Sequence, residues 1–361
     1  MPHAESRTRI AGGPAPLPRG FTSDNIAGAS PEVMDALVAC NVGQALPYGN
    51  DDLSRRLDRK VAEIFEHEVS VLLVSTGSAA NALALAAMTP PWGSVLGHGD
   101  AHINRDECGA PEFFTDGAKL VQIGGEHAKL DLAALKAQAT RMVGDVHSVQ
   151  PSCVSITQAT ELGTVYGLDE IAAIGDVCRS SGLGLHMDGA RFANAIVTLG
   201  CSPAETTWKR GVDVLSLGAT KNGTFGVDAI VVFRPELAQA LAFRRKRAGQ
   251  LNSKMRFFAA QMEVFLGDDL WLRNARQANA MAKSLAAGFA ALPGTEIQAE
   301  PQANILFCRL SQSLIQGLLD EGFRFYHDRW EQGVVRFVTS FATTQADVDD
   351  LLAAARTFSG K

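Results

Sequence analysis

Short apolar runs alternate with amphipathic stretches along most of the chain. Apolar, often β-branched runs predict buried strands, whereas apolar residues that recur every three or four positions predict helices. This alternation predicts an α/β fold with a mostly parallel sheet that helices cover on both faces. The predicted strands lie at 69–74, 94–97, 119–123, 152–157, 183–187, 212–217 and 229–233. The predicted helices lie at 31–40, 53–65, 78–88, 131–142, 168–181 and 235–247.

The pattern changes after about residue 270. It predicts a small α+β domain over residues 271–361 beside a large domain over residues 21–270, with residues 21–45 packing against the small one. Residues 1–20 are rich in Pro, Gly and Arg and are expected to be disordered or extended. The elements predicted for the small domain are an alanine-rich helix at 274–292, strands at 305–309 and 334–338, and helices at 313–321 and 344–358.

Composition narrows the class of protein. The chain has 361 residues, 46% of them hydrophobic and 20% charged, which is typical of a soluble globular protein with a sizeable core. A net charge of −6 gives no basic surface for nucleic acid. No apolar run reaches the roughly 18 residues of a membrane span. The six cysteines form no CxxC pair and are expected to be thiols in a reducing, cytoplasmic setting, without disulfides or a metal site.

One predicted strand ends in a lysine. The apolar run at 212–217 is followed by small residues, then Lys221, then a turn at Gly223. This order places a primary amine at the end of a strand, among apolar surroundings and with little bulk nearby. Such an amine is a nucleophile for carbonyl groups and can form a Schiff base. The alternative is a lysine whose charge simply extends from the strand end into water.

A second strand ends in a carboxylate. The run at 183–187 leads directly into Asp188. A carboxylate against a pyridine nitrogen keeps that nitrogen protonated, and the ring then accepts electrons from a bond broken at the substrate's Cα. An acidic partner and a Schiff-base lysine are the pair that pyridoxal phosphate requires. An aspartate alone at a strand end is more often a helix N-cap, but Asp188 together with Lys221 favours this cofactor.

Small polar residues follow the first predicted strand. Thr76, Gly77 and Ser78 come directly after the run at 69–74 and open the helix that follows. Ligands in open α/β sheets bind beyond the carboxyl ends of the strands. Backbone N–H groups at a helix start bind anions, so this turn is a candidate phosphate site. The alternative is an ordinary capped turn.

Two further strands also end in polar residues. His98 and His102 follow the strand at 94–97. A histidine there could stack on a planar ring or carry protons, and the alternative of a loop histidine without a role suits His98 better than His102. The polar residues after the strand at 152–157 are Gln158, Thr160 and Glu161.

At these residues the sequence resembles L-threonine aldolases, in the β-eliminating-lyase clan of fold type I pyridoxal-phosphate enzymes. It is similar above all to the bacterial low-specificity branch that includes phenylserine aldolase. The motifs span residues 21 to 340 in the family's order, and the one that contains Asp188, followed by Lys221, is the specific one. They are Phe-Thr-Ser-Asp-Asn at 21–25, Pro-Tyr-Gly at 47–49, Ser-Thr-Gly-Ser-Ala-Ala-Asn at 75–81, Ala-His-Ile at 101–103, Glu-Cys-Gly-Ala-Pro-Glu at 107–112, Ile-Thr-Gln-Ala-Thr-Glu at 156–161, His-Met-Asp-Gly-Ala-Arg at 186–191, Gly-Ala-Thr-Lys-Asn-Gly at 218–223, Ser-Lys-Met-Arg at 253–256 and Val-Arg-Phe-Val-Thr-Ser at 335–340.

The resemblance implies a role for each matching residue. Lys221 holds the cofactor as a Schiff base, Asp188 pairs with its pyridine nitrogen, and His102 stacks on the ring and acts in proton transfer; these three are the implied catalytic residues. The implied cofactor-binding residues are Thr76, Gly77, Ser78, His102, Gln158, Asp188, Arg191, Lys221 and Arg256. The implied substrate-binding residues are Ser23, Tyr48, Thr160, Arg191, His327 and Arg336.

Two of these implications concern more than one residue. Arg336, together with Ser23, is expected to hold the substrate carboxylate, because a planar guanidinium can bind both of its oxygens. Tyr48 and Arg256 are expected to reach the site of a neighbouring subunit. The family therefore implies a homodimer or homotetramer with shared active sites.

The sequence departs from the wider family at two positions. Common members have a histidine near the position of Thr160, where it can touch the β-hydroxyl of the substrate. Its absence leaves the acceptor of the hydroxyl proton open among His102, a water molecule and His327. The wider family also has Lys-Gly where this chain has Asn222 between Lys221 and Gly223, which affects the loop and its phosphate contacts.

The resemblance implies an aldolase that cleaves L-β-hydroxy-α-amino acids, of the threonine, allo-threonine or phenylserine type, to glycine and an aldehyde, reversibly. One alternative keeps the cofactor and changes the reaction to β-elimination or transamination. Another is a cofactor-free binding or scaffold protein of the same fold. A nucleotide-binding Rossmann protein is a weaker alternative, because no GxGxxG follows the first strand.

Overall fold

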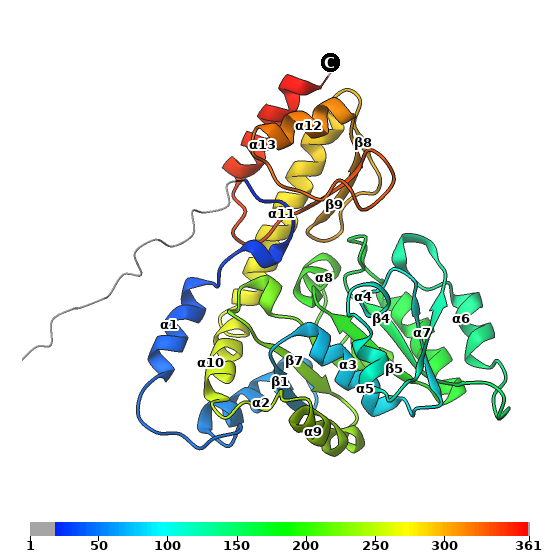
Figure 1. Cartoon of the computed structure of the whole chain (residues 1–361). Coiled ribbons are helices and arrows are strands. Elements are labelled where there is room, and N and C mark those ends of the chain that lie inside the picture. The colour runs from blue at the N-terminus through cyan, green and yellow to red at the C-terminus, as the bar shows by residue number, and fades with distance from the viewer. Residues whose placement is uncertain (1–18, 360–361) are drawn as a thin grey trace, which may run out of the picture.

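A large sheet organises the first two-thirds of the chain in the computed structural model, which describes residues 19–359 (Figure 1). Its strand order is β1-β7-β6-β5-β4-β2-β3. All neighbouring strands are parallel except β7, which is antiparallel to β1 and β6. The predicted mostly parallel sheet is therefore confirmed. The strands are β1 (Ser70–Val74), β2 (Gly93–His98), β3 (Lys119–Ile123), β4 (Gln150–Thr157), β5 (Gly184–Gly189), β6 (Val214–Leu217) and β7 (Asp228–Val232).

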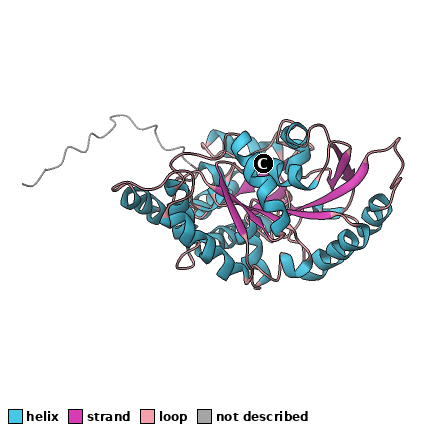
Figure 2. Cartoon of the chain, turned by 90° about the horizontal axis from the view of Figure 1, so that it is seen from below, coloured by secondary structure: helices cyan, strands magenta, loops and turns pink. Residues whose placement is uncertain are grey.

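Helices lie on both faces of this sheet (Figure 2). Successive side chains of a strand point to opposite faces. In β7, Ile230 packs with α3 and α9, whereas its neighbour Val231 joins the larger core formed with α2, α6 and α7. Burial on both faces explains the continuous apolar runs of the sequence. The helices are α1 (Pro31–Cys40), α2 (Asp52–Phe65), α3 (Gly77–Met88), α4 (His102–Arg105), α5 (Ala110–Phe114), α6 (Leu132–Ala139), α7 (Leu168–Ser181), α8 (Phe192–Leu199), α9 (Ala238–Arg247) and α10 (Arg256–Phe265).

The C-terminal part of the chain forms a second, smaller sheet with its own helices. An antiparallel sheet in the order β10-β9-β8 packs against α11, α12 and α13 around its own apolar core. Phe21 belongs to this core: its amide donates to the Arg324 carbonyl at 2.7 Å, and its carbonyl accepts from the Val338 amide at 2.8 Å. The elements are β8 (Glu296–Ile297), β9 (Ile305–Arg309), β10 (Val334–Val338), α11 (Leu270–Ala290), α12 (Gln312–Asp320) and α13 (Gln345–Phe358).

Helix α11 belongs to both cores. Trp271 and Ala275, in its first turns, pack in the core of the large sheet, whereas Leu285 and Phe289 pack in the core of the small one. Figure 1 shows the helix running from one part of the molecule into the other. The cores of the large and the small sheet are therefore joined by one continuous helix.

Several elements differ from the sequence-based expectations. The helices α4, α5, α8 and α10 were not predicted. In α8 the first five residues are all buried, so no polar face marks the helix there. The strand predicted at 212–217 begins at Val214, since the Val212 amide still bonds back to the Thr207 carbonyl. The segment 1–20 lies outside the described residues except for its last two. Within residues 19–359, no helix combines the length and apolarity that crossing a membrane requires.

Candidate active site

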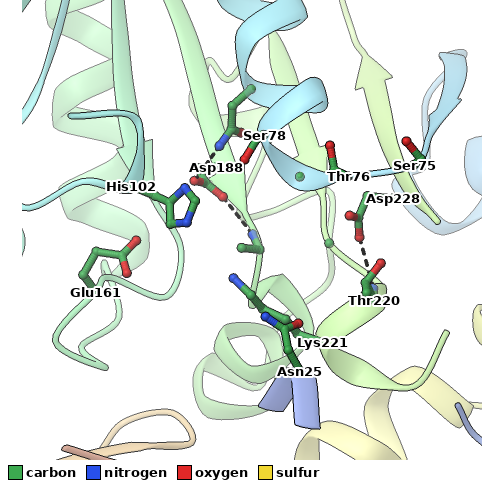
Figure 3. A pocket seen from close by; sticks show the side chains of 14 residues that line it. Asn25, Ser75, Thr76, Ser78, His102, Glu161, Asp188, Thr220, Lys221 and Asp228 are labelled. Atoms are coloured by element: carbon green, nitrogen blue, oxygen red, sulfur yellow. Dashed lines mark hydrogen bonds between the residues drawn. The ribbon is translucent and has the colours of Figure 1, made fainter. Parts of the chain in front are cut away.

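A cavity of about 310 Å³ lies beyond the carboxyl ends of β1, β5 and β6 (Figure 3). Its position agrees with the rule that open α/β sheets bind ligands at this edge. It brings together six of the predicted residues, namely Thr76, Gly77, Ser78, His102, Asp188 and Lys221. Lining side chains that were not predicted as site residues are Asn25, Ser75, Asn81, Glu161, Thr220 and Asp228.

Asp188 is held by two donors at the end of β5. Its Oδ2 accepts from Asn81 Nδ2 at 2.9 Å, and its Oδ1 accepts from the Ala190 amide at 3.0 Å. The side chain is buried, and both contacts orient the carboxylate at the cavity. A negative charge fixed in this way suits a protonated ring nitrogen.

His102 is oriented by Glu107. Its Nδ1 lies 2.8 Å from Glu107 Oε1, and the same oxygen accepts from Asn81 Nδ2 at 2.8 Å. The hydrogen bond to Glu107 raises the pKa of His102 against the opposing effect of burial. Burial raises the pKa of Glu107, and the nearby Asp188 raises it further. A continuous network thus joins His102, Glu107, Asn81 and Asp188.

Lys221 lies in a short 3-10 helix, Thr220–Asn222, directly after β6. Asp228 holds this loop, because its Oδ1 accepts from the amides of Ala219 at 2.7 Å and Thr220 at 3.1 Å. Burial raises the pKa of Asp228. No sequence signal marked Asp228, which simply precedes an apolar run.

The unusual Asn222 has a structural role. Its Nδ2 donates to the Trp271 carbonyl at 2.8 Å, and its own carbonyl accepts from Asn274 Nδ2 at 2.8 Å. Both contacts fasten the lysine loop to α11. Asn222, which precedes Gly223, therefore anchors the lysine loop to the long helix α11.

The first turn of α3 offers free amides. Thr76 caps the helix by accepting from the Ala79 amide at 3.1 Å. Gly77 and Ser78 are the first two helical residues, so their amides have no acceptor earlier in the helix. These amides, with the helix dipole behind them, form an anion site of the kind that holds a phosphate group.

The donor set fits pyridoxal phosphate. The amides at the start of α3 suit its phosphate, Asp188 suits its pyridine nitrogen, and Lys221 suits its aldehyde carbon. All of these groups line one cavity. Figure 3 shows the side chains of Asp188, His102 and Lys221 converging on the same space.

Two predicted side chains do not reach the cavity wall. Gln158 is fully buried, accepts from the Tyr166 amide and donates to the Tyr166 carbonyl, both at 3.0 Å. Thr160 is also fully buried, with its hydroxyl 2.7 Å from Thr164 Oγ1 and 3.2 Å from the His127 carbonyl. Because these polar groups bond to other protein groups and do not line the cavity, the structure does not place either one against a cofactor or substrate there.

Two of the three predicted arginines, Arg191 and Arg336, differ in their partners. Arg191 forms a buried bidentate pair with Asp24, at 2.8 Å from Nε to Oδ2 and 3.1 Å from Nη2 to Oδ1. Arg336 has no ion-pair partner within residues 19–359, and its buried Nε has no hydrogen-bond partner there. Its guanidinium lies over the rings of Tyr326, at 4.8 Å, and Trp330, at 5.5 Å. Burial and the neighbouring Arg191 lower the pKa of Arg336, so an added carboxylate would stabilise it.

The remaining predicted residues lie outside the cavity wall. Ser23 accepts from the Asn25 amide at 3.1 Å and so positions the short helix that contains Asp24. The ring of His327 packs edge-on against Phe325. Tyr48 is half exposed under Lys246, and Arg256 Nη1 donates to the Val42 carbonyl at 3.1 Å in a separate surface hollow.

Comparison with known proteins gives a consistent result. Residues 20–312 match the family model described as Beta-eliminating lyase. The low specificity L-threonine aldolase of Pseudomonas aeruginosa is 45% identical over 331 residues, which cover 92% of this chain and 95% of the relative. The threonine aldolase structure of Leishmania major superposes with a TM-score of 0.88 at 28% identity, covering 94% of this chain and 99% of that one. Serine palmitoyltransferase of S. paucimobilis, solved with PLP and myriocin, shares the fold at a TM-score of 0.70 and 16% identity, covering 94% of this chain and 86% of that one.

Proposed function

The chain belongs to the beta-eliminating lyase family, on its low-specificity L-threonine aldolase branch, and we propose that it cleaves L-β-hydroxy-α-amino acids to glycine and an aldehyde, reversibly. It is a pyridoxal-phosphate-dependent carbon–carbon lyase of fold type I. The expected substrates are of the threonine, allo-threonine and phenylserine type. The observation that carries the proposal is that the Lys221 amine and the Asp188 carboxylate line one cavity.

The chain's own residues would hold the cofactor at four points. Lys221 meets the aldehyde carbon, Asp188 the pyridine nitrogen, His102 the ring face, and the amides of Gly77 and Ser78 the phosphate. When bound, pyridoxal phosphate supplies a ring that takes up the electron pair left at Cα when the Cα–Cβ bond breaks.

The network around Asp188 prepares the site before substrate binds. Asn81 and the Ala190 amide keep the Asp188 carboxylate in place, and Glu107 keeps the His102 ring in place. Because these groups are already oriented, they need not rearrange during the reaction. The electrostatic environment at the pyridine nitrogen is thus fixed by the protein.

Arg336 orients the substrate. Its guanidinium lacks a partner among the described residues, so it can bind the α-carboxylate with two hydrogen bonds. Fixing the carboxylate fixes the rotation about Cα, which selects the bond that stands perpendicular to the ring and breaks. This control favours Cα–Cβ cleavage over loss of the α-proton.

An oligomer with shared active sites is supported by an exposed apolar strip on α1 and the loop after it. Its members are Met34, Val38, Val42 and Leu46. Arg256 and Tyr48 lie beside this strip and outside their own chain's cavity wall, where a second subunit could use them. A homodimer or homotetramer, in the cytoplasm, is the expected state; light scattering on the purified protein measures it.

Product analysis tests the reaction. The purified protein with pyridoxal phosphate is incubated with threonine, allo-threonine and the phenylserine isomers. Glycine and the matching aldehyde are expected. Pyruvate and ammonia, or a keto acid, would instead show β-elimination or transamination. A protein that gains no visible absorbance with the cofactor would be a binding protein of the same fold.

A further inference from the structure

Glu161 differs from the other carboxyl groups of the cavity. Asp188 and Asp228 each accept hydrogen bonds from two donors. The Glu161 carboxyl lines the same cavity but makes no hydrogen bond or ion pair with any residue between 19 and 359. Figure 3 shows it reaching into the space that His102 and Lys221 also face. A polar group left without a partner at a ligand site is available to the ligand.

The charges around Glu161 locate it relative to a bound amino acid. It interacts electrostatically with Lys221, where the substrate amine joins the cofactor, and with Arg336, where the carboxylate binds. Both groups that are expected to anchor an amino acid therefore act on Glu161, which puts this carboxyl group on the substrate side of the cavity. The charged groups that face Glu161 are Arg191, Lys221, Asp188, His102 and Arg336.

We propose that the Glu161 carboxylate takes the β-hydroxyl proton of the substrate during cleavage. The inference rests on the proposed function and supplies the base that the retro-aldol reaction needs. The proton passes from the hydroxyl to a Glu161 oxygen, and the O–H electron pair becomes the second bond of the aldehyde carbonyl. The Cα–Cβ pair stays with Cα, which takes up a proton to give glycine, so protons and electrons balance.

The other candidates for this base are less well placed. The Thr160 hydroxyl bonds to Thr164 and to the His127 carbonyl, away from the cavity. The His327 ring packs on Phe325 and does not line the cavity. The Nδ1 of His102 is engaged by Glu107 Oε1 at 2.8 Å, so that nitrogen is not available to the substrate hydroxyl.

The ionisation of Glu161 suits the role. Burial raises the pKa of its carboxyl group, and Asp188 adds to this effect, while Arg191, Lys221 and His102 oppose it. A general base works best when its pKa lies near the working pH, because it is then both ionised and basic. A raised value brings a glutamate closer to that condition.

The test separates steps that involve the hydroxyl from steps that do not. Glu161→Gln keeps the size of the side chain and removes its basicity. Cleavage of phenylserine is followed by the aldehyde released, and exchange of the α-proton of glycine in deuterated water is followed by NMR. Glycine has no β-hydroxyl. Cleavage by the variant should fall about 10²- to 10⁴-fold, whereas glycine exchange should stay within about threefold of the wild type.

A second measurement needs no cofactor. Thermal unfolding of the cofactor-free wild type and of Glu161→Gln is compared across pH. A carboxyl whose pKa is raised in the folded state contributes stability that is full below its unfolded pKa, about 4.3, and is lost as pH rises through its folded pKa. The melting temperature of the variant should therefore rise relative to that of the wild type as pH increases. A cooperative unfolding transition in the variant also shows that it folds.

Three outcomes would overturn the inference. One is cleavage by Glu161→Gln within threefold of the wild type. Another is an equal loss of cleavage and glycine exchange, which would place Glu161 in a step common to both. The third is a wild type that exchanges glycine but cleaves no substrate, which would refute the proposed function itself. Glu63→Gln, at an exposed site on α2, is the matched control and should leave both reactions unchanged.

Discussion

The two sides of the active site differ in how their charged groups are satisfied. On the cofactor side, the side chains of Asp188, Asp228 and His102 are each hydrogen-bonded by the protein itself. On the substrate side, formed by Glu161 and Arg336, neither charge has an ion-pair partner between residues 19 and 359.

The difference shows which charged side chains find their partners within the protein and which are left for a ligand to pair with. A charge that is buried without a partner is costly, so a site keeps one only where a bound molecule will compensate it. On the cofactor side, protein donors and acceptors already orient Asp188, Asp228 and His102. On the substrate side, Arg336 is left to pair with the carboxylate of an amino acid, and Glu161 is left to contact its hydroxyl group.

Lys221→Ala should have the largest effect, because it removes the only covalent link that the protein offers the cofactor. Activity should fall about 10⁴-fold or more, as on loss of other catalytic nucleophiles, and the visible absorbance gained on adding pyridoxal phosphate should disappear. Absorbance spectra and aldehyde release measure both. Lys136→Ala, at an exposed lysine on α6, is the control. Unchanged absorbance in Lys221→Ala would refute the assignment.

Arg336→Ala should weaken substrate binding next most strongly. Breaking a buried hydrogen-bonded charge pair costs about 2–5 kcal/mol, so KM for amino acids should rise roughly 30-fold or more. Arg336→Lys keeps the positive charge but loses the planar guanidinium, so its KM should lie between those of the wild type and of Arg336→Ala. Arg329→Ala is a matched control, since Arg329 also lies over the Tyr326 ring but is exposed. An unchanged KM in Arg336→Ala would show that the carboxylate binds elsewhere.

Glu107→Gln should have an intermediate effect through His102. Losing the charged acceptor lowers the pKa of His102, because the Glu107 hydrogen bond is what raises it. The kcat should fall about tenfold, as for lost hydrogen bonds to charged groups, and the limb of the pH profile that reports His102 should move to lower pH. NMR titration of the His102 ring checks the cause. An unshifted titration would show that Glu107 acts only on packing.

Thr160→Val should have the smallest effect on activity, because the hydroxyl points away from the cavity. The kcat should change by less than about threefold, whereas unfolding free energy should drop by about 1–3 kcal/mol, because a buried hydrogen bond is lost. Denaturant unfolding and initial rates separate the two. A large loss of kcat with normal stability would place Thr160 on the substrate side after all.

The parts of the site that follow a strand could be predicted from sequence. Asp188 and Lys221 each stand directly after an apolar run, and the strand-end rule then places them at one edge. Their supports could not be predicted. Asn81 lies inside an apolar helix and joins Glu107 and Asp188, which are 26 and 107 positions away. The inward position of Glu161 next to the outward Thr160 likewise depends on the local path of the chain.

Helix α11 has a consequence for which molecules the enzyme accepts. Near its start it holds the lysine loop, through Asn274 and the Asn222 carbonyl at 2.8 Å. One turn later its Ala278 carbonyl accepts from Thr339 Oγ1 at 2.7 Å, three residues beyond Arg336. Those two attachment points are roughly 6 Å apart along a rigid rod. The helix therefore fixes the separation between the Lys221 loop and the strand that contains Arg336. The site should reject β-amino acids, in which the amine and the carboxylate are one carbon further apart.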